Sequence, residues 1–185
     1  EIMPSLVGSE MCIRDSPKMK DSRANRMLID TVKDIDGVSV FNLYEEELPF
    51  NVDEWTRTIS DASAVVYQFP FYWLSAPSLL KKWQDEVFTY LSQTPAVAGK
   101  PLLVVTTTGS NAEAYRSGGK NCFTVDELLR PYQSSAIHSG MVWQTPIVVY
   151  GTGTGDIAKN AAEASNLYRQ KIESLLNSGH TGDSW

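Results

Sequence analysis

The sequence predicts an α/β fold, a three-layer sandwich in which helices cover both faces of a parallel sheet. Short apolar runs rich in β-branched residues alternate with segments whose apolar residues recur at helical spacing. The clearest unit spans residues 64–88, AVVYQFPFYWLSAPSLLKKWQDEVF, and combines a strand, an aromatic loop and an amphipathic helix. The chain contains no internal repeat or low-complexity tract. These observations predict one domain.

Composition narrows the class of protein. A chain of 185 residues with 42% hydrophobic content can bury a sizeable core. Its net charge of −6 argues against nucleic acid or an anionic membrane as a partner. The two cysteines, Cys12 and Cys122, have neither a metal-type spacing nor the pattern of a disulfide framework. Because no apolar run is long enough to span a bilayer, we expect a cytoplasmic protein.

The first sixteen residues, EIMPSLVGSEMCIRDS, form an atypical segment without a signal-peptide pattern. The tract 4–16 looks like a translated sequencing adapter, so we hypothesise that the segment is an artefact. Residues 11–13 could still provide a first strand, but Arg14 and Asp15 would then face burial without obvious partners. We expect the folded domain at 17–177 and a polar tail at 178–185.

The first half of the domain has clear element boundaries. A helix is predicted from Asp21 or Ser22, and Gly37 ends it. A β-branched strand follows at 38–44. Asp53 is predicted to cap a short helix that leads into the next strand.

The central strand is predicted at 64–69 and ends at Pro70, which cannot donate a hydrogen bond to a sheet. Ser75 is predicted to cap the helix that follows the aromatic loop. Because that loop leaves the carboxyl end of a strand, it lies where α/β folds bind their ligands. Pro146 suggests an edge or a bulge in the last strand. The later elements are a strand at 101–106, a loop at 107–121, a helix begun by a Thr124–Glu127 capping box, a strand at 141–150 and a final helix from Asp156.

Several segments together resemble the flavodoxin-like NAD(P)H:quinone oxidoreductases. That family includes bacterial general-stress reductases and the ancillary reductases of glutathione-gated potassium efflux. The matching segments are 68–88, GKPLLVVTTTGS at 99–110, Tyr115, Gly118, Gly119 and ELLRPYQ at 127–133. The resemblance extends over residues 17–152. It implies a five-stranded parallel sheet in the order 2-1-3-4-5, whose central first strand is replaced or degraded here.

The resemblance also implies a flavin site, with FMN preferred and FAD as the alternative. A helix start suits the flavin phosphate because free N–H groups and the helix dipole favour an anion there. The residues implied for the phosphate are Ser16, which replaces a family histidine, and Ser22, Arg23, Ala24 and Asn25. Those implied for the ring and its surroundings are Pro70, Phe71, Tyr72, Trp73, Leu74, Thr107, Thr108, Gly109, Ser110, Tyr115, Gly118 and Gly119.

Each local pattern also has a simpler interpretation. Ser22 could be an ordinary helix cap, and 71–74 could be an aromatic loop that covers the core. Tyr115, the catalytic candidate, could be a tyrosine of a surface loop. The histidine that the family places a few residues later is replaced by Asn121, so Tyr115 is expected to tune binding rather than relay protons.

The function implied by the resemblance is hydride transfer from NAD(P)H to a quinone or related acceptor in a ping-pong cycle. The family also implies a homodimer with the site at the subunit interface. Three alternatives remain: an ancillary subunit of a potassium-efflux transporter, an electron-carrier flavodoxin, and a chain that is inactive because its first strand is foreign. Residues 151–155 lack a dinucleotide fingerprint. His138 and His180 have no neighbouring metal ligands, so no metal site is expected.

Overall fold

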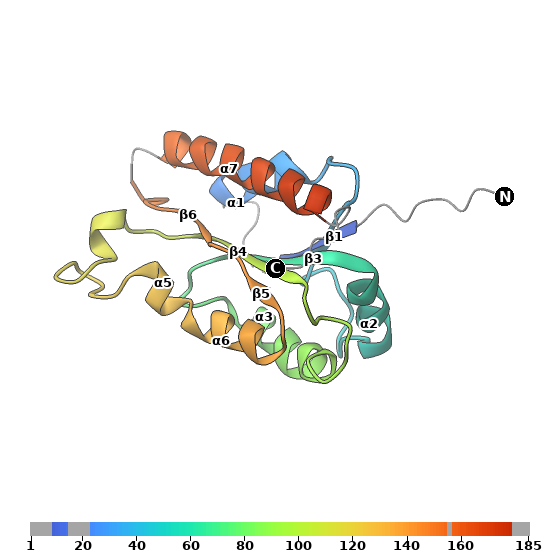
Figure 1. Ribbon diagram of the computed structural model, residues 1–185. Helices are drawn as coiled ribbons and strands as arrows, with labels where there is room; N and C mark the ends of the chain where they lie inside the picture. Colours follow the sequence, from blue (N-terminus) through green and yellow to red (C-terminus); the bar gives the residue numbers. More distant parts are fainter. Residues whose placement is uncertain (1–8, 15–22, 155–156, 179–185) are drawn as a thin grey trace.

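The computed structural model describes residues 9–14, 23–154 and 157–178, with residues 9–12 described by their backbone alone. A parallel sheet forms the middle layer of three (Figure 1). Helices α1 (Arg23–Val32) and α7 (Ile157–Ser178) cover one face of this sheet. Most of the remaining helices cover the opposite face (Figure 1). This architecture confirms the predicted three-layer sandwich.

The atypical N-terminal segment supplies the central strand, β1 (Ser9–Arg14). It pairs in parallel with β2 (Val38–Asn42) and with β3 (Ala62–Pro70), and β4 (Pro101–Thr107) pairs with the other side of β3. The position that the family's first strand would hold is therefore filled.

Arg14 was expected to be buried without a partner. Its side chain is only 12% exposed, and its guanidinium lies 4.0 Å from the Glu45 carboxylate. The expectation was therefore wrong only in part: the loop after β2 brings an acidic side chain within ion-pair distance, but the buried Arg14 Nε has no hydrogen-bond partner among the described residues. Asp15 lies outside the described residues.

The sheet order is β2-β1-β3-β4-β5, as predicted, but the last predicted strand is divided. It forms β5 (Val142–Trp143) and β6 (Ile147–Val149), and both pair with β4. Pro146 lies in the break. Because proline has no N–H to donate, the ladder is interrupted there and resumes at Ile147.

The helix α2 (Val52–Asp61) begins two residues earlier than predicted. Asn51, not Asp53, is the N-cap: its side chain accepts a hydrogen bond of 3.2 Å from the Glu54 N–H. Asp53 instead lies in the first turn, where its negative charge interacts favourably with the helix dipole. Either residue type can cap a helix, so the sequence pattern could not separate them.

The helix after the aromatic loop is α3 (Ser78–Trp83), which continues through a π-helical turn (Gln84–Phe88) into α4 (Thr89–Leu91). Its N-cap is Pro77, which makes no side-chain cap bond. The prediction that Ser75 caps this helix was wrong. The Ser75 hydroxyl instead lies 3.1 Å from the Tyr132 hydroxyl of a neighbouring helix.

The predicted Thr124–Glu127 capping box is confirmed, with both of its reciprocal hydrogen bonds formed. It begins α5 (Val125–Leu128), and Leu129 separates this short helix from α6 (Arg130–His138). Pro131 is tolerated because it occupies the first turn of α6.

Two apolar clusters hold the layers together, one on each face of the sheet. On the face covered by α2, α3 and α6, the completely buried Trp83 makes edge contacts with Trp55 at 5.4 Å and Tyr67 at 6.0 Å between ring centroids. On the other face, Leu28 and Val32 of α1 pack with Tyr168 of α7. In the described part of the chain, no helix is both long and apolar enough to cross a membrane.

Candidate functional site

The carboxyl ends of β3 and β4 meet at one edge of the sheet. Pro70 and Thr107, the last residues of the two strands, are register partners. Beyond them, the Phe71 N–H donates a hydrogen bond of 2.8 Å to the Thr107 carbonyl. The structure thus brings the two predicted ring-contacting segments together. We call residues 71–74 the β3 corner and residues 107–110 the β4 corner.

The β3 corner leads into a tight turn from Tyr72 to Ser75. Each of these two residues donates its N–H to the other's carbonyl, at 2.8 and 3.2 Å. The middle residues, Trp73 and Leu74, have φ of 50° and 63°. Two consecutive left-handed residues define a type I′ turn, which normally uses asparagine and glycine. Tryptophan and leucine in these positions store backbone strain, and such strain is often found at functional sites.

The side chains of the β3 corner do not cover the core. Trp73 is 99% exposed, and Tyr72 and Leu74 are also exposed. Phe71 alone is packed, half-buried and stacked on Phe69 with 6.4 Å between ring centroids. The simpler interpretation of a core-covering loop is therefore wrong for three of the four residues.

The β4 corner is built in the opposite way. Thr107 and Thr108 are buried, and the Thr108 hydroxyl donates to the Ser110 carbonyl at 2.9 Å. The Thr108 N–H donates to Val149 of β6 at 2.9 Å. At Gly109 a Cβ would meet no atom within 4 Å, so one side of the corner is open.

The two corners together offer backbone donors. Within the described residues, the N–H groups of Trp73, Leu74, Gly109 and Ser110 donate to no other group. Oriented backbone N–H groups stabilise negative charge, which a flavin ring gains when it is reduced. An exposed aromatic turn beside an open glycine also suits a flat apolar ring. On this geometry, the residues present fit a flavin.

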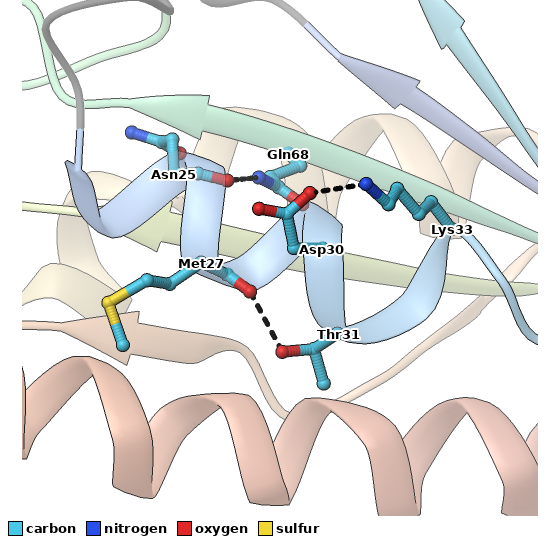
Figure 2. Close-up of polar contacts among 6 residues, drawn as sticks. All are labelled: Asn25, Met27, Asp30, Thr31, Lys33 and Gln68. Atoms are coloured by element: carbon cyan, nitrogen blue, oxygen red, sulfur yellow. Dashed lines mark hydrogen bonds and ion pairs between the residues drawn. The ribbon is translucent and has the colours of Figure 1, made fainter.

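The start of α1 is less available to a phosphate than predicted. Arg23 is exposed, but Ala24 and Asn25 are buried. The Asn25 side-chain amide donates to the Thr107 hydroxyl at 3.0 Å. The Asn25 backbone carbonyl accepts from the Gln68 side-chain amide at 3.1 Å (Figure 2). The Asn25 side chain therefore ties α1 to the β4 corner. Ser16 and Ser22 lie outside the described residues.

Tyr115 lies between the two corners. It is 8% exposed, so the interpretation as a surface tyrosine is wrong. Its ring makes an edge contact with Phe71 at 6.2 Å and a tilted contact with Tyr150 at 5.9 Å. Burial raises the pKa of its hydroxyl, and hydrogen bonds with the Thr108 and Ser110 side chains partly offset that rise.

Gly118 and Gly119 close the loop that follows Tyr115. Gly118 has φ of 79°, a conformation that favours glycine. A Cβ on Gly119 would lie 2.4 Å from the Glu113 carbonyl oxygen and 2.7 Å from that of Ala114. The loop therefore folds back so closely that Gly119 admits no side chain.

Sequence reasoning missed a third strand end at this edge. After β6, the N–H groups of Gly151, Thr152 and Gly153 donate to the carbonyls of Ser110, Thr108 and Gly109, at 2.8, 2.9 and 3.1 Å. A Cβ on Gly153 would lie 3.2 Å from the Gly109 oxygen. These glycines brace the β4 corner. Their position directly after the last strand was the signal that could have found them.

Charged side chains cover the outer side of the helix that follows the β3 corner. Lys81 pairs with Asp85 and Lys82 with Glu86 along the exposed side of the α3 helix. His138 is the last residue of α6. The described residues include no group of three or more side chains that could hold a metal ion.

Comparison with known proteins identifies relatives with the same fold. A model of the Flavodoxin_2 family, described as flavodoxin-like fold, matches residues 11–172. The glutathione-regulated potassium-efflux system ancillary protein KefF of Enterobacter sp. (strain 638) is 35% identical over 162 residues, which cover 84% of this chain and 90% of KefF. General stress protein 14 of Treponema denticola, solved in complex with FMN, is 26% identical with a TM-score of 0.80, over 90% of this chain and 99% of that one. An NADPH-quinone reductase from P. pentosaceus is 25% identical with a TM-score of 0.75, over 86% of this chain and 97% of that one. The chain therefore belongs to the Flavodoxin_2 family, as the resemblance predicted.

Proposed function

We propose that this protein is an FMN-dependent oxidoreductase that transfers a hydride from NAD(P)H to a quinone or a related acceptor. The observation that carries the proposal is the pair of adjacent corners, joined by the hydrogen bond from Phe71 to Thr107 and carrying four backbone donors. The structural likeness to an FMN complex and to an NADPH-quinone reductase supports it.

In this proposal the two corners hold the ring, and the start of α1 holds the phosphate with the Arg23 side chain and backbone N–H groups. Bound FMN would supply the redox chemistry, because its ring takes a hydride from NAD(P)H and returns it, with a solvent proton, to reduce a quinone to a hydroquinone. Trp73 and Leu74 orient the ring through their backbone. FMN is preferred to FAD because the chain lacks an evident segment for an adenine.

Tyr115 is proposed to hold a proton beside the ring. Its hydroxyl is protonated at neutral pH, because the usual tyrosine pKa of about 10 lies far above neutrality and burial raises the pKa further, so the hydroxyl can donate a hydrogen bond. The Thr108 and Ser110 side chains lower this pKa in part, which places them beside the hydroxyl. Because the family's histidine is replaced by Asn121, Tyr115 tunes binding rather than relaying protons to a base.

A spectroscopic experiment tests the proposal. The purified protein is mixed with FMN, separated from free flavin, and reduced with NADPH or NADH without oxygen. We expect bound flavin whose visible absorbance is lost with the nicotinamide and restored when a quinone is added. A protein that stays colourless with added FMN would reject the cofactor. Flavin that NAD(P)H does not reduce would instead favour an electron carrier.

A second candidate function is that of an ancillary subunit of a glutathione-gated potassium-efflux transporter. The 35% identity with KefF favours it. Co-purification of the protein with such a transporter, and a change in its potassium efflux, would support this role. Rapid quinone turnover by the isolated protein would support the enzymatic role. Light scattering would test the implied homodimer in the same preparation.

A further inference from the structure

The strained turn of the β3 corner is held from outside by one residue, Tyr132 of α6. The Tyr132 hydroxyl oxygen accepts a hydrogen bond of 3.1 Å from the Ala76 N–H and lies 3.1 Å from the Ser75 hydroxyl. Ser75 is the last residue of the turn, and Ala76 directly follows it. Because the Ala76 N–H supplies its proton to Tyr132, the tyrosine proton remains available for the Ser75 oxygen.

The ring of Tyr132 also supports the strand that enters the turn. It packs against Phe69 with 5.3 Å between ring centroids, and Phe69 stacks on Phe71. Tyr132 is 6% exposed, so its ring is fixed by its surroundings. One side chain thus contacts the chain on both sides of the left-handed pair, by apolar contact before it and by hydrogen bonds after it.

Such support is needed because two consecutive left-handed non-glycine residues are unfavourable. Each left-handed L-residue costs about 1–2 kcal/mol, and persists only where the surroundings determine the conformation. Within the turn, only the reciprocal hydrogen bonds between Tyr72 and Ser75 oppose this cost. The bonds with Tyr132 hold Ser75 and Ala76 in place at the end of the turn.

We propose that Tyr132 is a positioning residue for flavin binding: its hydroxyl holds the Tyr72–Ser75 turn closed, which aims the Trp73 and Leu74 N–H groups at the ring. This inference rests on the proposed function. It requires the hydroxyl specifically, since a phenylalanine would keep the contact with Phe69 and lose only the hydrogen bonds to Ser75 and Ala76.

Loss of the hydroxyl is compatible with folding. Ser75, Ala76 and Tyr132 line a surface hollow of about 710 Å³ together with Ser78 and the charged residues of α3 and the π-helical turn. Ala76 is half-buried and lines this hollow, so we expect water to replace the Tyr132 hydroxyl at its N–H in Tyr132→Phe. The variant is therefore suited to a binding experiment.

The test compares wild type, Tyr132→Phe, Ser75→Ala and, as a matched control, Tyr90→Phe. Tyr90 is 60% exposed and lies in α4. Three quantities are measured: the Kd for FMN, the reduction potential of the bound flavin, and hydrogen exchange of the segment 71–77 without flavin. Urea unfolding confirms that each variant is folded.

We expect Tyr132→Phe to raise the Kd for FMN about tenfold, as the loss of one or two hydrogen bonds would predict. The potential should become more negative, because misplaced donors stabilise the reduced ring less. Exchange of segment 71–77 should become faster. Ser75→Ala should change each quantity in the same direction by less, since it retains the bond from Ala76, and Tyr90→Phe should change none.

Two outcomes would overturn the inference while leaving the proposed function intact. In one, Tyr132→Phe matches wild type in Kd, potential and hydrogen exchange. In the other, its Kd rises while its potential and the exchange of the turn stay at wild-type values, which would reduce Tyr132 to a general packing role. A wild-type protein that binds no FMN would reject the proposed function, and this inference with it.

Discussion

Three of the four residues of the β3 corner are exposed and two of them are strained, whereas the β4 corner, one hydrogen bond away, begins with two buried threonines and is braced by neighbouring backbone. Trp73 of the first is 99% exposed with φ of 50°. Thr108 of the second is fully buried, and its N–H and hydroxyl both donate hydrogen bonds within the sheet edge. Both corners follow neighbouring parallel strands, so their difference does not come from the sheet.

The difference suggests a division of labour. The β4 corner is held by Asn25 of α1, by β6 and by the turn after β6, so it can act as a fixed wall. The exposed aromatic turn of the β3 corner lowers the stability of the protein, and such destabilising conformations are common at binding sites. A ligand between them would contact one rigid side and one side whose shape depends on the turn.

The largest expected effect is a difference in stability between alanine substitutions at two glycines of the loop that follows β4. Gly119→Ala should lower the free energy of unfolding by about 3 kcal/mol, because its Cβ would overlap the carbonyls of Glu113 and Ala114. Gly109→Ala should change it by less than about 0.5 kcal/mol, because its Cβ enters open space. Urea unfolding of the flavin-free proteins measures both.

For the Kd for FMN, in contrast to stability, the effect is expected at Gly109. If the open side of Gly109 faces the ring, the alanine should raise the Kd for FMN about tenfold, the effect of a modest steric overlap. A Gly109→Ala protein with unchanged stability and unchanged affinity would show that the β4 corner does not approach the ring. Equal stability losses at both glycines would contradict the contrast within this loop.

A smaller effect, of opposite sign at two sites, tests the strain of the β3 corner. Trp73→Asn should raise the free energy of unfolding by about 1 kcal/mol, because asparagine tolerates the left-handed conformation and Trp73 loses no burial. Leu167 is a matched control, 53% exposed within the regular helix α7. Leu167→Asn should lower the free energy of unfolding by about 0.5 kcal/mol, because asparagine has a lower helix propensity than leucine. If Trp73→Asn is destabilising, the turn is not strained.

The sequence was a good guide where one periodicity dominated. The run at 64–69 and the Thr124–Glu127 pair led to correct elements, because strand burial and capping depend on residues close in the chain. The choice of Asn51 over Asp53 as a cap could not be predicted, because both residue types cap helices. The break at Pro146 depends on where the ladder with β4 lies. The central strand β1 was the least predictable, because its pairing with β2 and β3 is entirely long-range.

The site divides in the same way. The parallel topology predicted that the segments after β3 and β4 lie side by side. The structure confirms this prediction. The burial of Asn25 against Thr107, 82 residues apart, could not be read from the helix start at which it lies. The left-handed conformation of Trp73 and Leu74 contradicts their local preferences, so only the surrounding structure, including Tyr132, determines it.

The smallest expected effect concerns Tyr115, which lies between the two corners. Because burial raises its pKa, it should ionise above the usual value of about 10, as seen in the tyrosinate absorbance of wild type minus Tyr115→Phe. Thr108→Val and Ser110→Ala should raise the pKa further, because each removes a hydrogen bond that lowers it. In the unfolded chain the same tyrosine loses its proton first, so its contribution to stability is present below about pH 10 and declines as the pH rises. Ionisation at or below pH 10 would place Tyr115 in water rather than between the corners.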